Sequence, residues 1–217
     1  MRITSVILNV KCQCQTKIKM GSSRSEKAAS HERIVSAAAA QIRRDGTDAV
    51  RVSELMREAG LTHGAFYRHF GSRDDLIAEA IDAALTDGSR RANPSPDMDP
   101  ASALLAIIDG YLAQAHRDHP ELGCAVAALP ADVSRGSTGA REAYGRQVRS
   151  YIDRLVGLMP DAESEADRDE AMLTLAALVG AVSMARAVYD TELSDEILAW
   201  TERALHRRIE ERDGSDD

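Results

Sequence analysis

Residues 51–75, RVSELMREAGLTHGAFYRHFGSRDD, decide the fold of this chain. Within them, residues 52–59 carry apolar side chains at the three-and-four spacing of a helix with one buried face. Gly60 follows, and its permissive backbone lets the chain leave that helix sharply. A second helix is predicted from about residue 62 to residue 69. A helix this short is unstable alone in water, so it must pack on its neighbours and leave its polar side free.

The free side of this second helix has the residue types of a DNA-reading surface. In a helix-turn-helix, one helix braces the second, which places its N-terminal residues in the major groove. Thr62 and His63 can exchange hydrogen bonds with base edges, and the small residues after them keep the helix slim. SRDD at residues 72–75 matches a capping pattern and predicts a third helix that starts beside backbone phosphate. The same pattern also fits a short helical hairpin inside an all-helical core.

The run VSELMREAGLTHGAFYRHFGSRDDL, with the Asp45-Gly46 stop before it, resembles the DNA-binding domain of the TetR/AcrR family of bacterial repressors. The resemblance covers residues 28–88 and implies a three-helix head whose helix-turn-helix spans residues 51–70. Arg73 stands where the family usually has lysine, and Ile42 stands where it has an aromatic residue. The resemblance implies base and phosphate contacts at Arg51, Ser53, Thr62, His63, Gly64, Ala65, Tyr67, Arg68, His69 and Arg73.

Composition predicts an all-α protein, because aromatic residues make up only 4% of a chain rich in alanine and leucine. Residues 1–27 are expected to form a disordered tail, and a start at Met20 would make residues 1–19 an extension. Residues 100–212 are expected to form a helical effector-binding and dimerisation bundle, which with the head gives about nine helices. We expect a helix capped by Ser30 at about 30–44, a last helix capped by Ser194, and others at about 73–87, 101–118, 140–158 and 163–190, with a linker at 88–100.

The net charge of −8 argues against a nucleic-acid binder until its distribution is considered. Residues 21–90 carry ten basic and eleven acidic side chains, whereas residues 91–217 carry thirteen basic and twenty-four acidic ones. The acidity therefore lies in the C-terminal part. An acidic body is repelled by DNA and orients the near-neutral head toward it.

The three cysteines and the start of the chain favour a cytoplasmic protein. An odd number of cysteines without a secretory signal indicates reduced thiols. Residues 3–10 form an apolar run too short to cross a membrane. Cys12 and Cys14 are too closely spaced for a zinc knuckle, and His116, His119 and Cys124 are a weak metal set, so we expect no metal and no cofactor.

The two last helices, at about residues 163–212, resemble the pair through which the family forms homodimers. The alternative is that their apolar faces belong to an ordinary core within one chain. A two-fold dimer would present two heads to the half-sites of an inverted repeat in double-stranded operator DNA.

A pocket for an unknown small-molecule effector is expected between the helices of the body. Cys124 is the cysteine of a Gly-Cys segment, in ELGCAVAAL from residue 121, that is similar to one in a TetR subgroup that also shares the LSDEIL stretch at residues 193–198. Some relatives in that subgroup respond to electrophiles or oxidants through this thiol, and the alternative is an inert buried cysteine. The candidate effector or sensing residues are Tyr111, His116, Cys124, Tyr144, Met184 and Tyr189, each of which could instead be plain core.

The sequence has no signature of an enzyme. It lacks G-x-S-x-G, a phosphate loop, H-E-x-x-H and the Rossmann glycines. The expectation is therefore a sequence-specific DNA-binding repressor, released from a palindromic operator by a small-molecule or electrophile inducer. An activator, or an adaptor that does not bind DNA, remains the alternative on the same fold.

Overall fold

The computed structural model describes residues 24–91, 95, 97–160 and 164–213, and this part of the chain is all-α, without strands. The expected tail up to residue 23, with Cys12, Cys14 and Met20, lies outside the described residues. The elements are α1 (Arg24–Asp45), η1 (Thr47–Ala49), α2 (Val52–Glu58), η2 (His63–Arg68), α3 (Arg73–Arg91), α4 (Pro100–Leu112), α5 (Gln114–Asp118), η3 (Pro120–Leu122), α6 (Ala125–Ala128), α7 (Pro130–Arg135), α8 (Thr138–Val156), α9 (Glu165–Ala187) and α10 (Thr191–Asp213), where η marks a 3-10 helix.

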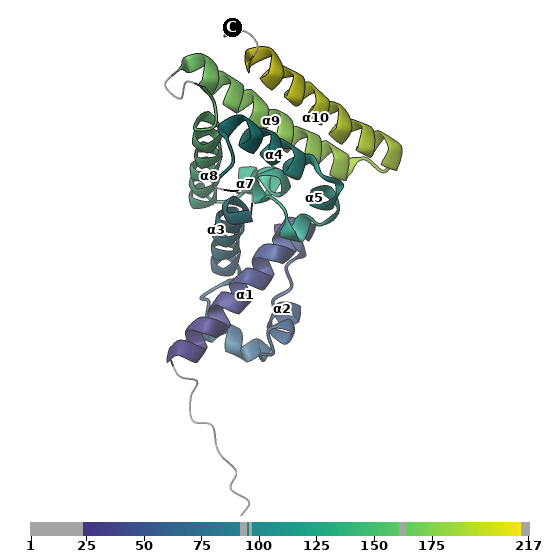
Figure 1. Ribbon diagram of the computed structural model, residues 1–217. Coiled ribbons are helices and arrows are strands. Elements are labelled where there is room, and N and C mark those ends of the chain that lie inside the picture. The colour runs from purple at the N-terminus through teal and green to yellow at the C-terminus, as the bar shows by residue number, and fades with distance from the viewer. Residues whose placement is uncertain (1–23, 92–94, 96, 161–163, 214–217) are drawn as a thin grey trace, which may run out of the picture.

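The head is built by α1, α2, η2 and α3 at one end of the molecule (Figure 1). Its core is apolar and fully covered. The two phenylalanines predicted to face inward, Phe66 and Phe70, are 2% and 3% exposed and stack with ring centroids 5.3 Å apart. Gly60 leaves α2 with φ +72, a left-handed conformation that other residues adopt at a cost. The predicted helix-turn-helix is therefore present, with its second helix in the tighter 3-10 form.

The body holds α4 to α10, and α9 and α10 lie side by side at the end of the molecule farthest from α2 (Figure 1). α9 is long and apolar enough to span a membrane, but it packs against α4, α8 and α10 as a bundle helix. Near its start, two buried carboxylates are paired with α10: Glu170 with Arg208 at 2.6 Å, and Asp167 with Arg212. These ion pairs tie the start of α9 to the end of α10.

Several expected boundaries were wrong. α1 begins at Arg24, inside the expected tail, and α3 continues to Arg91, into the expected linker. The expected helix at 101–118 is broken at Ala113, whose backbone is extended. The break follows from the carbonyl of Tyr111, which bonds to the side chain of His116 at 2.6 Å instead of to the next helical turn. Pro130 begins α7.

Both expected serine caps were also wrong. Ser30 lies inside α1, where its hydroxyl donates to the carbonyl of Glu26 at 2.8 Å. Ser194 lies inside α10 and is buried, and its hydroxyl donates to the carbonyl of Ala185 at 2.7 Å. The start of α10 is capped by Asp190, whose carboxylate accepts from the backbone N–H of Glu192 at 2.9 Å.

Candidate nucleic-acid interface and buried polar cluster

The outer side of α2 and η2 exposes most of the expected DNA contacts. Tyr67 is 69% exposed, yet its ring meets the buried ring of Phe66 edge-on at 5.3 Å, so the core holds it in place. Ala65 is 7% exposed and packs in the core, so its methyl group does not lie on this outer surface. The exposed expected contacts are Arg51, Ser53, Thr62, His63, Gly64, Tyr67 and Arg68.

Arg73 and His69 lie at the edge of this surface and are partly buried. The guanidinium of Arg73 donates to the carbonyls of Thr47, at 2.6 Å, and Val50, at 3.4 Å. It thereby holds the segment between α1 and α2, in addition to any contact with phosphate. Burial, and then the nearby His31, lowers the pKa of the His69 ring, so the ring is neutral at neutral pH. Its Nδ1 is buried without a hydrogen-bond partner among the described residues.

The start of α3 has the predicted cap. The hydroxyl of Ser72 accepts from the backbone N–H of Asp75 at 3.1 Å. This confirms the capping pattern and fixes where α3 begins relative to η2.

The head packs against the body through α1 and α3, which contact η3, α6 and α8, and two sets of polar contacts add to this packing. The carboxylate of Asp132, in α7, accepts from the backbone N–H of Thr47 at 3.0 Å and from its hydroxyl at 2.7 Å. Gly46 suits the start of this loop because its backbone has φ +80, a left-handed conformation that other residues adopt at a cost. Arg43, in α1, donates to the carbonyl of Glu121 at 2.9 Å. A movement of α7 therefore acts directly on the loop that Arg73 also holds.

Polar side chains gather in the interior of the body around Cys124. The backbone N–H of Cys124 donates to Nε2 of His116 at 2.9 Å, so the proton of this ring is on Nδ1, facing the carbonyl of Tyr111. Burial, and secondarily the charge of Arg186, lowers the pKa of His116. The Cys124 thiol lies 3.7 Å from the hydroxyl of Tyr151. The cluster thus combines a neutral imidazole, a thiol and phenols.

The phenols of this cluster stay protonated. Burial raises the pKa of Tyr111 well above its usual value of 10, with proximity to Cys124 as the next cause, and the same causes raise the pKa of Tyr151. Burial raises the pKa of Tyr144 to about 12, and its hydroxyl donates to the carbonyl of Val126 at 2.8 Å. The phenols are therefore hydrogen-bond donors at neutral pH.

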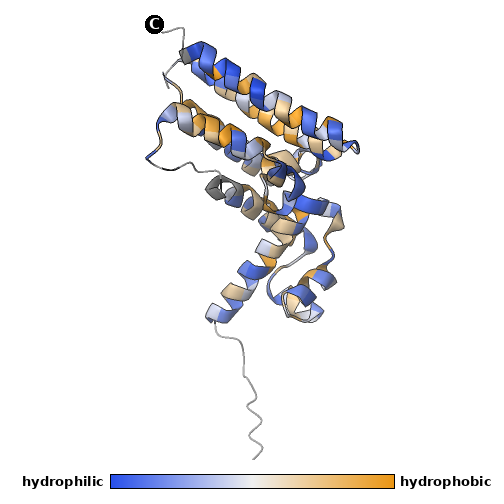
Figure 2. Cartoon of the chain, turned by 45° about the vertical axis from the view of Figure 1, so that its right-hand side comes forward, coloured by the Kyte–Doolittle hydropathy of each residue, from blue (hydrophilic) through white to orange (hydrophobic). Residues whose placement is uncertain are grey.

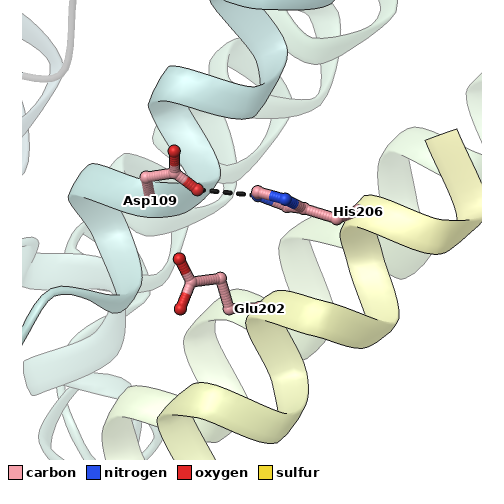
Figure 3. Close-up of side chains that lie close together, drawn as sticks. All are labelled: Asp109, Glu202 and His206. Carbon is pink, nitrogen blue, oxygen red and sulfur yellow. Dashed lines mark hydrogen bonds and ion pairs between the residues drawn. The ribbon is translucent and has the colours of Figure 1, made fainter. Parts of the chain in front are cut away.

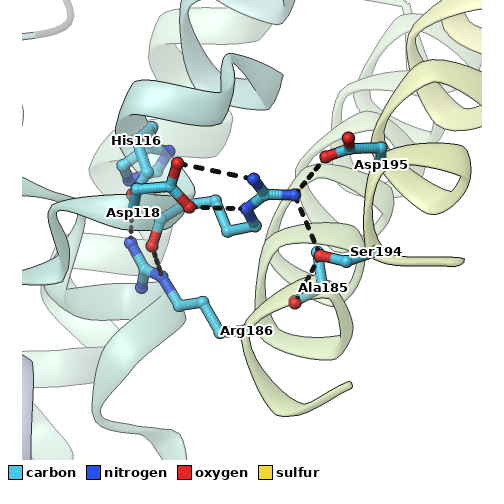
Figure 4. Close-up of polar contacts among 7 residues, drawn as sticks. His116, Asp118, Ala185, Arg186, Ser194 and Asp195 are labelled. Carbon is cyan, nitrogen blue, oxygen red and sulfur yellow. Dashed lines mark hydrogen bonds and ion pairs between the residues drawn. The ribbon is translucent and has the colours of Figure 1, made fainter. Parts of the chain in front are cut away.

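Three buried polar atoms of the body have no hydrogen-bond partner among the described residues. They are the Tyr111 hydroxyl, Nε2 of Gln147 and Nη1 of Arg186. The rest of the Arg186 guanidinium donates to the carbonyls of His116, at 2.5 Å, and Arg117, at 3.2 Å (Figure 4). Buried polar atoms are rarely left unpaired, which makes this cluster a candidate ligand site.

The structure brings together four of the six expected effector residues. Tyr111, His116, Cys124 and Tyr144 belong to or border the cluster. Met184 is 55% exposed and Tyr189 is fully exposed, so neither belongs to it. Gln147 and Arg186 were not predicted as members, although an arginine within the long apolar helix α9 was a usable signal.

The segment that carries His116 is fastened to α10. Arg117 pairs with Asp118 at 2.7 Å and with Asp195, and also donates to the hydroxyl of Ser194 at 3.0 Å (Figure 4). His119 lies apart from the cluster, exposed, with Nδ1 3.4 Å from Glu121. The weak metal set of His116, His119 and Cys124 is therefore not assembled.

Comparison with known proteins gives one consistent result. Residues 34–80 match the family model "Bacterial regulatory proteins, tetR family". An uncharacterised HTH-type transcriptional regulator of Mycobacterium tuberculosis strain H37Rv is 28% identical over 194 residues, covering 83% of this chain and 96% of the relative.

Solved structures share the fold. A TetR transcriptional regulator from Chloroflexus aurantiacus matches with a TM-score of 0.71 and 23% identity, covering 85% of this chain and 96% of that one. Reduced NemR of Escherichia coli matches with a TM-score of 0.66 and 20% identity, covering 81% and 96%. Residues 34–80 are therefore similar to the DNA-binding domain of the TetR family, and the described chain shares the fold of TetR-family transcriptional regulators.

Proposed function

We propose that this regulator is a homodimeric repressor that binds a palindromic operator and is released by a small molecule or an electrophile. The observation that carries the proposal is the division of polar groups between two places. One set lies exposed on the outer side of α2 and η2, and the other is buried and partly unpaired around Cys124. The first set suits a ligand as large as DNA, and the second suits a ligand small enough to be enclosed.

The exposed set supports specific recognition. His63 and Thr62 stand at the start of η2, where a recognition helix presents side chains to base edges. Arg51 and Arg68 lie on the same exposed surface and supply positive charge for phosphates. Because these positive charges lie on the surface proposed to face DNA, they attract phosphates there although the body as a whole is acidic.

Dimerisation through α9 and α10 is supported by exposed apolar surface. Six of the nine large apolar side chains that are exposed among the described residues lie on these two helices or the turn between them. Apolar residues run along this pair at the end of the molecule (Figure 2). An exposed apolar surface of this kind is typical of a protein interface. The six residues are Met172, Leu173, Met184, Tyr189, Leu193 and Trp200.

The coupling from body to head follows a short path. Cys124 is the residue before α6, α6 leads directly into α7, and α7 carries Asp132, which holds Thr47 of the head. A ligand or adduct at Cys124 that favours another position of α6 and α7 would change the placement of the head. It would lower operator affinity only by its difference in affinity for the two states.

Cys124 is the proposed sensing residue, with an inert buried thiol as the alternative. Its side chain is 7% exposed, so an electrophile must enter during a local opening of the body. E. coli NemR, one of the structural neighbours, was crystallised in a reduced form. The test is a gel shift on the intergenic DNA beside the regulator's own gene, before and after treatment with a quinone.

The expected result is a complex that wild-type protein loses after quinone treatment and that Cys124→Ser retains. The matched control is a Cys12→Ser/Cys14→Ser variant, which should release DNA as wild type does. Release that is unchanged in Cys124→Ser would rule out the sensing role. A promoter fusion that loses expression when the regulator is deleted would favour an activator, and no complex with any promoter fragment at low salt would favour an adaptor.

A further inference from the structure

We propose that Asp109, Glu202 and His206 bind a divalent transition-metal ion where α4 meets α10. The three side chains come from two helices and converge on one point (Figure 3). Their nearest ligand atoms all lie within 4.8 Å of one another. The proposal does not depend on the repressor function or on the identity of the effector.

The two ligands on α10 follow from helix geometry. Glu202 and His206 are four residues apart, so they lie one turn apart on the same face of α10. Asp109 lies opposite them on α4, and its carboxylate is 2.7 Å from Nε2 of His206. Ligand atoms bound to one ion at about 2.1 Å are separated by roughly 3–4 Å. Small rotations about the side-chain bonds therefore suffice to form the site.

The charges at this point favour a cation. Two carboxylates face a single imidazole, which is neutral in the form that binds a metal. Glu202 has no hydrogen bond or ion pair with any other residue that the structure describes, although its side chain is partly buried. A divalent ion between the two carboxylates would neutralise both, and the half-exposed position leaves room for water as the remaining ligands.

The ligand set indicates the class of metal. One imidazole and two carboxylates, without sulfur, suit zinc and other late first-row ions better than magnesium or calcium, which prefer oxygen alone. Such an ion would fasten α4 to α10. Asp109 precedes Tyr111 of the buried cluster by two residues, and α10 belongs to the proposed dimer surface. Metal binding would therefore stiffen the connection between these two parts of the body.

The test is titration of the full-length protein with Co²⁺, a probe whose absorption spectrum separates nitrogen and oxygen ligands from thiolates. We expect one equivalent to bind per chain with a spectrum free of sulfur charge transfer. His206→Gln and Glu202→Gln should each weaken binding by at least about tenfold. The matched control is His31→Gln, which removes the partly exposed histidine of a similar ion pair, 2.6 Å from Glu79, and should leave Co²⁺ affinity unchanged.

Thermal unfolding supplies a second readout that does not depend on the spectrum. At about a hundredfold excess over Kd, Co²⁺ should raise the Tm of wild-type protein by roughly 5 °C or more, and that of Glu202→Gln by much less. Circular dichroism of each variant without metal shows whether it is folded. Co²⁺ binding that is equally tight in wild type, His206→Gln and Glu202→Gln would overturn the proposal, as would absence of binding by folded wild-type protein.

Discussion

The head exposes the polar side chains of its candidate site, whereas the body buries those of its own. On the head, a short helix with a tightly packed apolar side exposes its polar residues to solvent. In the body, phenols, an imidazole, a thiol and an arginine are buried together, and some of their atoms lack partners. The difference is what the proposed function needs, with a head that meets a ligand outside the molecule and a body that encloses one.

The largest expected effect is on the apolar support of the head. Phe66→Ala removes a buried ring, which should destabilise the fold by about 3–5 kcal/mol and abolish operator binding. Chemical unfolding followed by circular dichroism measures the loss. Tyr67→Phe, which changes the exposed neighbour by one hydroxyl, should keep wild-type stability. A Phe66→Ala protein of unchanged stability would show that η2 does not depend on its core.

The next effect concerns the exposed surface of the body. Trp200→Glu places a charge in the proposed dimer surface and should weaken dimerisation by about 2 kcal/mol or more, roughly thirtyfold. Analytical ultracentrifugation across a dilution series gives the dimer Kd. Tyr67→Glu, at another exposed aromatic residue, should leave it unchanged. Equal dimer Kd values for Trp200→Glu and wild type would contradict the assignment of α9 and α10.

Arg73 sharpens the comparison, because this expected phosphate contact also holds the segment between α1 and α2 through its hydrogen bonds. Loss of its bonds to Thr47 and Val50 in Arg73→Ala should lower stability by about 1.5 kcal/mol and weaken binding to operator and random DNA alike. If it also contacts phosphate, the slope of log affinity against log salt should fall by about one unit. A lower affinity with an unchanged slope would assign Arg73 a positioning role alone.

The smallest effect is a pH dependence that arises in the body. The pKa of His116 is lowered in the folded protein, so below about pH 6.5 the unfolded chain binds a proton that the folded chain does not. The contribution of the neutral His116 ring to the free energy of unfolding is fully present above about pH 6.5. It is lost as the pH falls toward the pKa that this ring has in the folded protein. His116→Gln should flatten the loss of unfolding free energy between pH 7 and 5. A slope as steep as wild type would contradict the neutral, bonded state of this ring.

The head was predictable from sequence because its signals are local. The apolar spacing of α2, the turn at Gly60 and the cap at Ser72 all lie within one run of the chain, and the structure confirms each of them. Ala65 shows the limit of this reasoning, because a small residue suits both a groove contact and a packed core, and here it is buried.

The body was less predictable because its signals are long-range. The break at Ala113 depends on a side-chain bond from His116, and the start of α10 depends on Asp190 in place of Ser194. Helical spacing does not show which face of α9 is covered by its neighbours. Met184 was therefore expected at the pocket but is exposed. Arg186, two residues later, reaches into the cluster and was not expected there.

The central claim is that the exposed side of η2 enters the DNA groove, and His63→Ala tests it most directly. Affinities for the operator and for random DNA of equal length are measured at one salt concentration, with His119→Ala, at an exposed histidine of the body, as control. We predict that His63→Ala loses about 1–3 kcal/mol on the operator and little on random DNA. Operator affinity equal to that of wild type would contradict this account of the surface.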